Sequence, residues 1–227
     1  MDIVLSYAEY GTGSPLFLLH GNGEDRSYFD AQVSAFSSQH HVYAVDTRGH
    51  GQSPRGIAPF SLSQFADDLH ALMDHLNINQ ANILGFSDGG NIALLFAIRY
   101  PERVKRLMIN GANLYPAGMN FIPWITIDLL FIRACFATLF SSRLVHRREL
   151  LGLMATQPHI HPKALRSLCI PTLVIAGTKD LIRERHTRLI ARSIPESKLL
   201  FLEGGHCIAQ ENTSGFNQAI LSFLAEK

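Results

Sequence analysis

The segment Gly85-Phe86-Ser87-Asp88-Gly89 has the residue types and spacing of a serine held out for nucleophilic attack. An apolar run precedes it and a helix-like pattern follows it, so the chain is expected to turn sharply from a strand into a helix at Ser87. Gly85 and Gly89 fit a place where the crossing strand and helix leave no room for a Cβ. We predict that Ser87 is a nucleophile. An ordinary glycine-rich turn is the alternative interpretation.

A serine hydroxyl needs a base to take its proton and an acidic group to orient that base. His206 lies on a glycine-rich loop after the last predicted strand, and Asp180 follows the strand before it. Loops after parallel strands share one edge of a sheet, so both side chains are expected beside Ser87. The sequence therefore predicts a triad of Ser87, Asp180 and His206. An aspartate that makes only local backbone bonds in a turn is the alternative for Asp180.

The other histidines and the cysteines do not indicate a metal site. His186 is one of several histidines that lie on polar or helical stretches and are expected to be solvated. His159 and His161 form a weak pair, but no carboxylate or thiol cluster joins them, so no metal is predicted. Cys207, next to His206, is interpreted as a small packing residue.

The segment His20-Gly21-Asn22-Gly23 follows an apolar run and is predicted to form part of an oxyanion hole. Small residues let the backbone approach a substrate, so Gly21 is expected to contact it. The N–H groups of Asn22 and Asp88 are the expected donors to the developing oxyanion. Losing one such donor typically costs about 3 kcal/mol of barrier. A simple turn at the end of a strand is the alternative.

Strand and helix signals alternate along the chain, which predicts an α/β fold with a mostly parallel sheet covered on both faces. Short apolar runs bounded by Gly, Pro, Asp or Asn are typical of buried parallel strands. An additional strand is expected around residues 3–10. The other predicted strands are 16–19, 42–45, 83–84, 106–109, 172–176 and 198–202. The predicted helices are 61–76, 87–100, 184–193 and 213–225.

The alternation breaks in residues 111–166, an apolar, helix-like segment with several arginines. We interpret it as a short helical cap inserted into an α/β core of residues 1–110 and 167–227. Within it, residues 121–140 are interpreted as a lid over an apolar pocket, because internal Pro, Asp and Arg residues disfavour a membrane span. A membrane-associated surface is the alternative, and no stable membrane insertion is expected.

Aromatic residues of the expected cap are the candidates for its contacts with a substrate. Phe121, Trp124 and Phe131 would line an apolar pocket, although such residues also pack a lid onto the body. The basic residues Arg143, Arg147 and Arg148 are expected on a solvated helix face.

Composition narrows the class of protein. The 227 residues suffice for one α/β domain with a sizeable core. With a net charge of +1 and no basic stripe, the chain is not expected to bind nucleic acid. Three widely spaced cysteines and an N-terminus without a basic signal region predict a cytoplasmic location. The sequence does not determine the oligomeric state.

These motifs resemble those of the α/β-hydrolase superfamily over almost the whole chain. The matching segments, in the family's order, are residues 20–23, 46–53, 85–90, 100–104, 177–180 and 204–206. The resemblance implies a Ser87–His206–Asp180 triad, a covalent acyl-enzyme split by water, a variable cap after the sixth strand and no cofactor.

The residues around Ser87 narrow the resemblance further. Haloalkane dehalogenases and epoxide hydrolases use an aspartate at this position and are disfavoured. The Ser-Asp-Gly-Gly run is similar to that of the valacyclovir-hydrolase group, which cleaves amino-acid esters. A carboxylate at Asp88 would attract a substrate ammonium. The alternative is that this carboxylate bonds locally and only the Asp88 N–H has a role.

The expected function is therefore hydrolysis of small carboxylic esters, with thioesters, amides and amino-acid esters as further candidates. A cofactor-free lyase or perhydrolase on the same triad is the first alternative. A non-catalytic ligand receptor is the second, although a receptor has no need of all three triad residues. The sequence does not determine the natural substrate.

Overall fold

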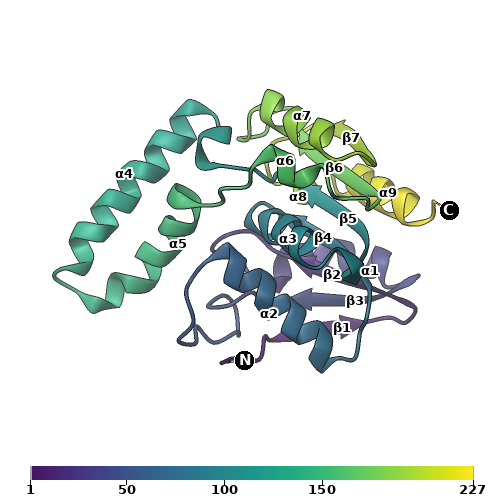
Figure 1. Cartoon of the computed structure of the whole chain (residues 1–227), viewed down its shortest axis with the longest axis horizontal. Coiled ribbons are helices and arrows are strands. Elements are labelled where there is room, and N and C mark those ends of the chain that lie inside the picture. The colour runs from purple at the N-terminus through teal and green to yellow at the C-terminus, as the bar shows by residue number, and fades with distance from the viewer. Residues whose placement is uncertain (1, 227) are drawn as a thin grey trace.

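A seven-stranded sheet lies at the centre of the computed structural model, which describes residues 2–226 (Figure 1). The strand order is β1-β3-β2-β4-β5-β6-β7, and all neighbours are parallel except β1 and β3. This confirms the predicted mostly parallel sheet. The strands are β1 (Tyr7–Tyr10), β2 (Ser14–Leu19), β3 (His40–Val45), β4 (Ala81–Phe86), β5 (Val104–Asn110), β6 (Thr172–Gly177) and β7 (Ser197–Leu202).

Several strands begin at other residues than the apolar pattern predicted. β2 and β3 each begin two residues before the predicted run, because polar residues there still pair across the ladder, as Ser14 does with His40. The expected N-terminal strand of residues 3–10 is wrong in its first half, since only Tyr7–Tyr10 pairs with β3. Ile3 and Leu5 are buried without joining the sheet, so their apolar pattern indicated packing rather than pairing.

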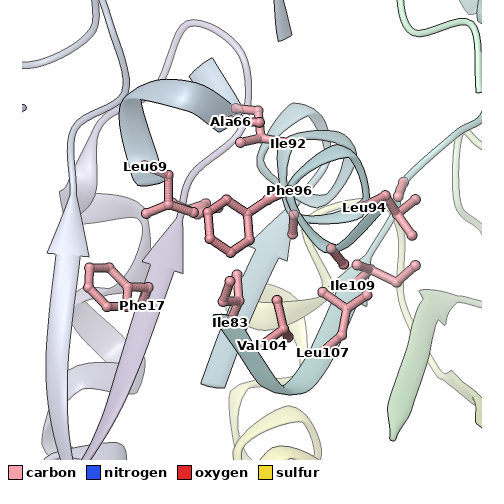
Figure 2. Packing of buried hydrophobic residues seen from close by; sticks show 14 of the residues in the cluster. Phe17, Ala66, Leu69, Ile83, Ile92, Leu94, Phe96, Val104, Leu107 and Ile109 are labelled. Carbon is pink, nitrogen blue, oxygen red and sulfur yellow. The ribbon is translucent and has the colours of Figure 1, made fainter. Parts of the chain in front are cut away.

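Helices cover both faces of the sheet, as predicted, and each face has its own apolar cluster. One cluster includes α2, α3, α6 and α7, and Figure 2 shows Phe96 of α3 pointing between the helices and the strand residue Ile83. The second cluster includes α1, α8 and α9. The helices are α1 (Asp30–Phe36), α2 (Leu62–His75), α3 (Asp88–Arg99), α6 (Pro162–Leu165), α7 (Glu184–Ser193), α8 (Ile208–Glu211) and α9 (Thr213–Leu224), with short 3-10 turns η1 (Arg26–Phe29) and η2 (Pro101–Arg103).

Two further helices occupy the segment between β5 and β6 and extend to one side of the sheet layers (Figure 1). α4 (Phe121–Thr138) runs outward and α5 (Val145–Thr156) returns beside it. The 3-10 turns η3 (Pro116–Gly118) and η4 (Ser142–Leu144) begin and join this hairpin. The hairpin is the part of the chain in which the sequence predicted a helical insertion.

A fully buried guanidinium fixes the loop after β3. Arg48 donates through Nε and Nη2 to both carboxylate oxygens of Asp68 on α2, each at 2.7 Å, and also pairs with Asp2. Removing Asp68 leaves Arg48 Nε without an acceptor and the buried guanidinium with the partly exposed Asp2 as its remaining carboxylate, and breaking a buried pair typically costs about 3–5 kcal/mol.

We expect Asp68→Ala to lower the free energy of unfolding by about 3 kcal/mol or more in urea titrations. Asp74→Ala on the same helix is the matched control, because Asp74 is exposed and its ion pair with Arg103 should contribute under about 1 kcal/mol. Equal losses in the two variants would contradict a structural role for the buried pair.

His186 is buried, so its expected solvation is wrong. Its Nε2 accepts the Leu114 N–H at 2.9 Å, which requires a neutral ring. Burial and the neighbouring Arg183 and Arg185 lower the pKa of His186 to about 4. The burial of His186 could not be predicted from the sequence, because the packing of α7 against the chain after β5 creates the site.

Stability should therefore depend on pH through His186. Above its unfolded pKa near 6.5 the ring is neutral in both states, and as the pH falls toward 4 only the unfolded state binds the proton. We expect the free energy of unfolding to drop by on the order of 1–3 kcal/mol over this range. His186→Gln should flatten that slope and His75→Gln, on an exposed ring, should not. An unchanged slope in His186→Gln would refute this assignment.

Candidate active site

Ser87 sits at the sharp turn between β4 and α3. Its backbone has φ 53° and ψ −118°, a left-handed conformation that non-glycine residues rarely adopt. A Cβ on Gly85 would lie 2.2 Å from the Gly89 carbonyl oxygen, and one on Gly89 would lie 2.1 Å from the Leu19 carbonyl oxygen. The crossing strand and helix therefore leave no space there, as the sequence predicted.

Ser87, His206 and Asp180 form a continuous hydrogen-bonded chain. His206 Nε2 lies 3.0 Å from Ser87 Oγ, and His206 Nδ1 lies 2.7 Å from Asp180 Oδ1. The three residues follow β4, β7 and β6, so the shared sheet edge brings together positions far apart in the sequence. With a proton on Nδ1, Nε2 is free to accept the serine proton.

The imidazole and the carboxylate are held by their surroundings. The Phe86 ring packs against His206 with centroids 4.9 Å apart. A Cβ on Gly111, which has φ +64°, would lie 2.7 Å from His206 Cε1, so this glycine makes room for the ring. Asp180 is buried, and its Oδ1 also accepts the Ile182 N–H at 2.8 Å. The role of Gly111 could not be predicted from the sequence, because only the folded chain places this glycine against His206.

The loop after β2 brings Gly21 and Asn22 beside Ser87 and His206. His20 is buried, and its Nε2 accepts the Thr47 N–H at 3.0 Å, which leaves the proton on Nδ1 for the Gly21 carbonyl oxygen at 2.7 Å. Burial lowers the pKa of His20, which keeps the ring neutral in this arrangement. His20 thus fixes the loop that carries Asn22.

A buried polar network surrounds Asp88. Bonding of this carboxylate within the protein was the alternative interpretation from the sequence, but its partners were not identified there. Asn22 Nδ2 donates to Asp88 Oδ2 at 2.9 Å and to the carbonyl oxygen of Leu150 on α5 at 3.0 Å. Asn91 Nδ2 donates to Asp88 Oδ1 at 3.2 Å and to Asn113 Oδ1 at 3.0 Å. Burial raises the pKa of the Asp88 carboxyl. Among the described residues, only the side-chain amides of Asn22 and Asn91 donate hydrogen bonds to the Asp88 carboxyl.

A cavity of about 180 Å³ opens beside Ser87 and His206. Gly21, Asn22 and Asp88 line it, together with apolar side chains from both sides of the hairpin's base. These apolar residues include Met119, Ile127, Met154, Leu181 and Ile182.

The aromatic residues expected to contact a substrate lie elsewhere. Phe121 lines a separate, open groove that reaches Asp180 and His206. Trp124 packs near Phe121 with ring centroids 6.3 Å apart, and Phe131 packs against Gly152 of α5. Trp124 and Phe131 do not line the cavity, and Ile127 is the residue of α4 that does. The apolar pattern of the segment could not show which of these side chains reaches the cavity.

Residues 14–132 match the family model of the alpha/beta hydrolase fold, which is more than half of the chain. The chain belongs to the α/β-hydrolase family. This α/β hydrolase is 28% identical to 3-oxoadipate enol-lactonase 2 of Acinetobacter baylyi, over 96% of the chain and 92% of the relative.

Two further similarities cover nearly whole chains. This α/β hydrolase is 30% identical to a 2-hydroxymuconate semialdehyde hydrolase of Pseudomonas sp. strain CF600, over 95% of the chain and 88% of that protein. The crystal structure of a hydrolase from Pseudomonas aeruginosa superposes with a TM-score of 0.80 at 27% identity, and the match covers 99% of this chain and 95% of the other. Within residues 2–226, no group of three or more His, Cys, Asp or Glu side chains could hold a metal ion.

Proposed function

We propose that this α/β hydrolase cleaves small carboxylic esters through an acyl-enzyme on Ser87. The observation that carries the proposal is the hydrogen-bonded chain from Ser87 Oγ through His206 to Asp180, placed in the wall of a cavity. The relative named an enol-lactonase acts on a cyclic ester, which supports the same bond type here. We further propose that residues 111–166 are the cap and that residues 1–110 and 167–227 are the core.

In the proposed reaction, Ser87 Oγ attacks the ester carbonyl carbon while His206 Nε2 takes the hydroxyl proton. The N–H groups of Asn22 and Asp88 stabilise the oxyanion. Asp180 stabilises the imidazolium, which then gives its proton to the leaving alcohol oxygen. Water, deprotonated by His206, attacks the acyl carbon, and collapse of the second oxyanion releases the acid and restores Ser87.

The charges that line the cavity favour neutral or amino-bearing esters. Its ionisable lining residues are Glu24, Asp88, His206 and Cys207, and no Lys or Arg lines it within residues 2–226. Glu24 is half-buried and accepts the Gly21 N–H at 3.0 Å, and burial raises the pKa of its carboxyl. Carboxylates in a confined site attract an ammonium group and repel an anionic acyl chain.

If the Asp88 carboxyl selects amino-bearing esters, Asp88→Asn should reduce the preference for them. We expect kcat/KM for an α-amino ester, divided by kcat/KM for its neutral analogue, to fall by roughly ten-fold. Paired esters that differ only in the amino group measure this ratio. Glu24→Gln is the matched control for a second carboxyl of the same cavity. An unchanged ratio in Asp88→Asn would mean that this carboxyl has only its local bonds to Asn22 and Asn91.

The bond cleaved is tested by product analysis over a panel of small esters, thioesters and amides, with Ser87→Ala as the inactive control. Formation of one acid and one alcohol, in equal amounts and dependent on Ser87, is the expected result. Cyanide release from hydroxynitriles or turnover that requires peroxide would instead support the lyase or perhydrolase alternatives. Tight, saturable binding of a ligand without turnover would support a receptor.

A further inference from the structure

The outer face of α4 is an apolar stripe that the rest of the chain does not cover. The helix is long and apolar enough to cross a membrane by length and composition, yet Ala134 is its only buried residue. Its exposed large side chains recur at helical spacing and occupy the side away from α5. We call Ile122, Ile125, Leu129, Ile132 and Phe136 the outer stripe, with exposed fractions from 39% to 73%.

The outer stripe extends along most of the helix. Ile122 and Phe136 are separated by fourteen positions, which corresponds to about 21 Å of helix. In Figure 1, α4 is the outermost element of its side of the molecule. An exposed apolar surface of this extent marks an interaction site.

The charges beside the outer stripe are basic. Arg133 and Arg147 line one hollow between α4 and α5, and Arg143 is exposed on the turn that joins the two helices. None of the three arginines forms an ion pair within residues 2–226. Of the hairpin's acidic residues, Glu149 already pairs with Arg55 at 2.6 Å, and Asp128 is left, among the described residues, as one unpaired carboxylate against the three arginines. The net free charge beside the stripe is therefore positive.

Two possible partners of the outer stripe, the interior of a membrane and a second copy of the chain, fit the charged residues beside it poorly. A membrane-spanning arrangement would bury Asp128 and Arg133 in hydrocarbon, which is costly. A second copy packed symmetrically on the outer stripe would offer, from the described part of the hairpin, only Asp128 as an unpaired carboxylate to three unpaired arginines, Arg133, Arg143 and Arg147, so most of the positive charge would lack a partner. An anionic surface that also accepts apolar side chains satisfies both the stripe and the arginines.

We propose that α4 lies in the plane of an anionic phospholipid surface, with the outer stripe among the acyl chains and Arg133, Arg143 and Arg147 at the headgroups. Arginine side chains near an apolar stripe reach the headgroup level by extending their stems. Phe121 and Ile122 begin α4 and also line the open groove that reaches Asp180 and His206. Docking would therefore bring that groove to the lipid surface.

The test is co-sedimentation of the full chain with vesicles of phosphatidylcholine alone and of phosphatidylcholine and phosphatidylglycerol in equal parts. We expect binding at least about ten-fold tighter to the anionic vesicles, weakened by high salt. A variant with Ile125→Ser, Leu129→Ser and Phe136→Ser should bind at least about ten-fold more weakly. Arg133→Gln with Arg147→Gln should remove the preference for anionic vesicles.

Ile57→Ser is the matched control, because Ile57 is 94% exposed in the loop before α2 and should leave vesicle binding unchanged. Circular dichroism and thermal unfolding show whether each variant is folded. Equal binding to both vesicle types, or no binding by the folded wild type, would overturn the proposal. So would a dimer in solution that the triple variant dissociates, if the wild type also fails to bind vesicles. Because phospholipids themselves carry carboxylic esters, every chain in the assay also carries Ser87→Ala, so that vesicle binding is measured independently of the proposed hydrolysis.

Discussion

Replacing Ser87 with alanine is expected to reduce kcat for ester hydrolysis by about 10⁴- to 10⁶-fold, the range found when a triad nucleophile is removed from other serine hydrolases. The variant lacks the oxygen that lies 3.0 Å from His206 Nε2, so no acyl-enzyme forms. The methyl group of alanine fits where the serine Cβ already lies, so the free energy of unfolding should change little. Steady-state kinetics and a urea titration measure the two quantities.

Ser63→Ala is the matched control for the loss of a hydroxyl, because Ser63 is exposed on α2 and does not line the cavity. Its kinetics should equal those of the wild type. Retention of substantial turnover by folded Ser87→Ala would exclude an acyl-enzyme on this residue.

Asp180→Asn should have the second largest effect, a reduction of kcat by about 10⁴-fold. The magnitude is that of the same substitution in another serine hydrolase. Asp180 Oδ1 meets two donors, His206 Nδ1 and the Ile182 N–H. An asparagine that turns its NH₂ group toward His206 places the ring proton on Nε2, the atom that must accept the proton of Ser87.

The same assay distinguishes this tautomer effect from a loss of substrate binding. KM should change far less than kcat, and Asp25→Asn, on an exposed carboxyl of the same sheet edge, should leave both unchanged. A rise in KM alone would mean that Asp180 serves the substrate and does not orient His206.

The sheet and the placement of the proposed triad were predictable because they follow from topology. Parallel strands end at one edge, so residues directly after β4, β6 and β7 must lie near each other once the strands are recognised. The lack of room for a Cβ at Gly85 and Gly89 was predictable for a similar reason, because the strand and the helix cross closely at such a turn.

What the sequence did not reveal depends on contacts between distant segments. The bond from Asn22 to the Leu150 carbonyl oxygen joins the loop after β2 to α5, and no local pattern at either position indicates it. His186 is one of eleven histidines, and only the packing of α7 buries it. Trp124 and Phe131 were expected at the substrate because both are aromatic residues of an apolar segment, and the sequence does not determine which side chains of α4 reach the cavity.

Labelling with a fluorophosphonate probe tests the central claim most directly, because the probe reacts with a serine only when a neighbouring base activates it. We predict that the folded wild type is labelled on Ser87 and that Ser87→Ala and His206→Ala are not labelled. Labelling of folded Ser87→Ala, or the absence of labelling in the folded wild type, would contradict an activated serine at this site.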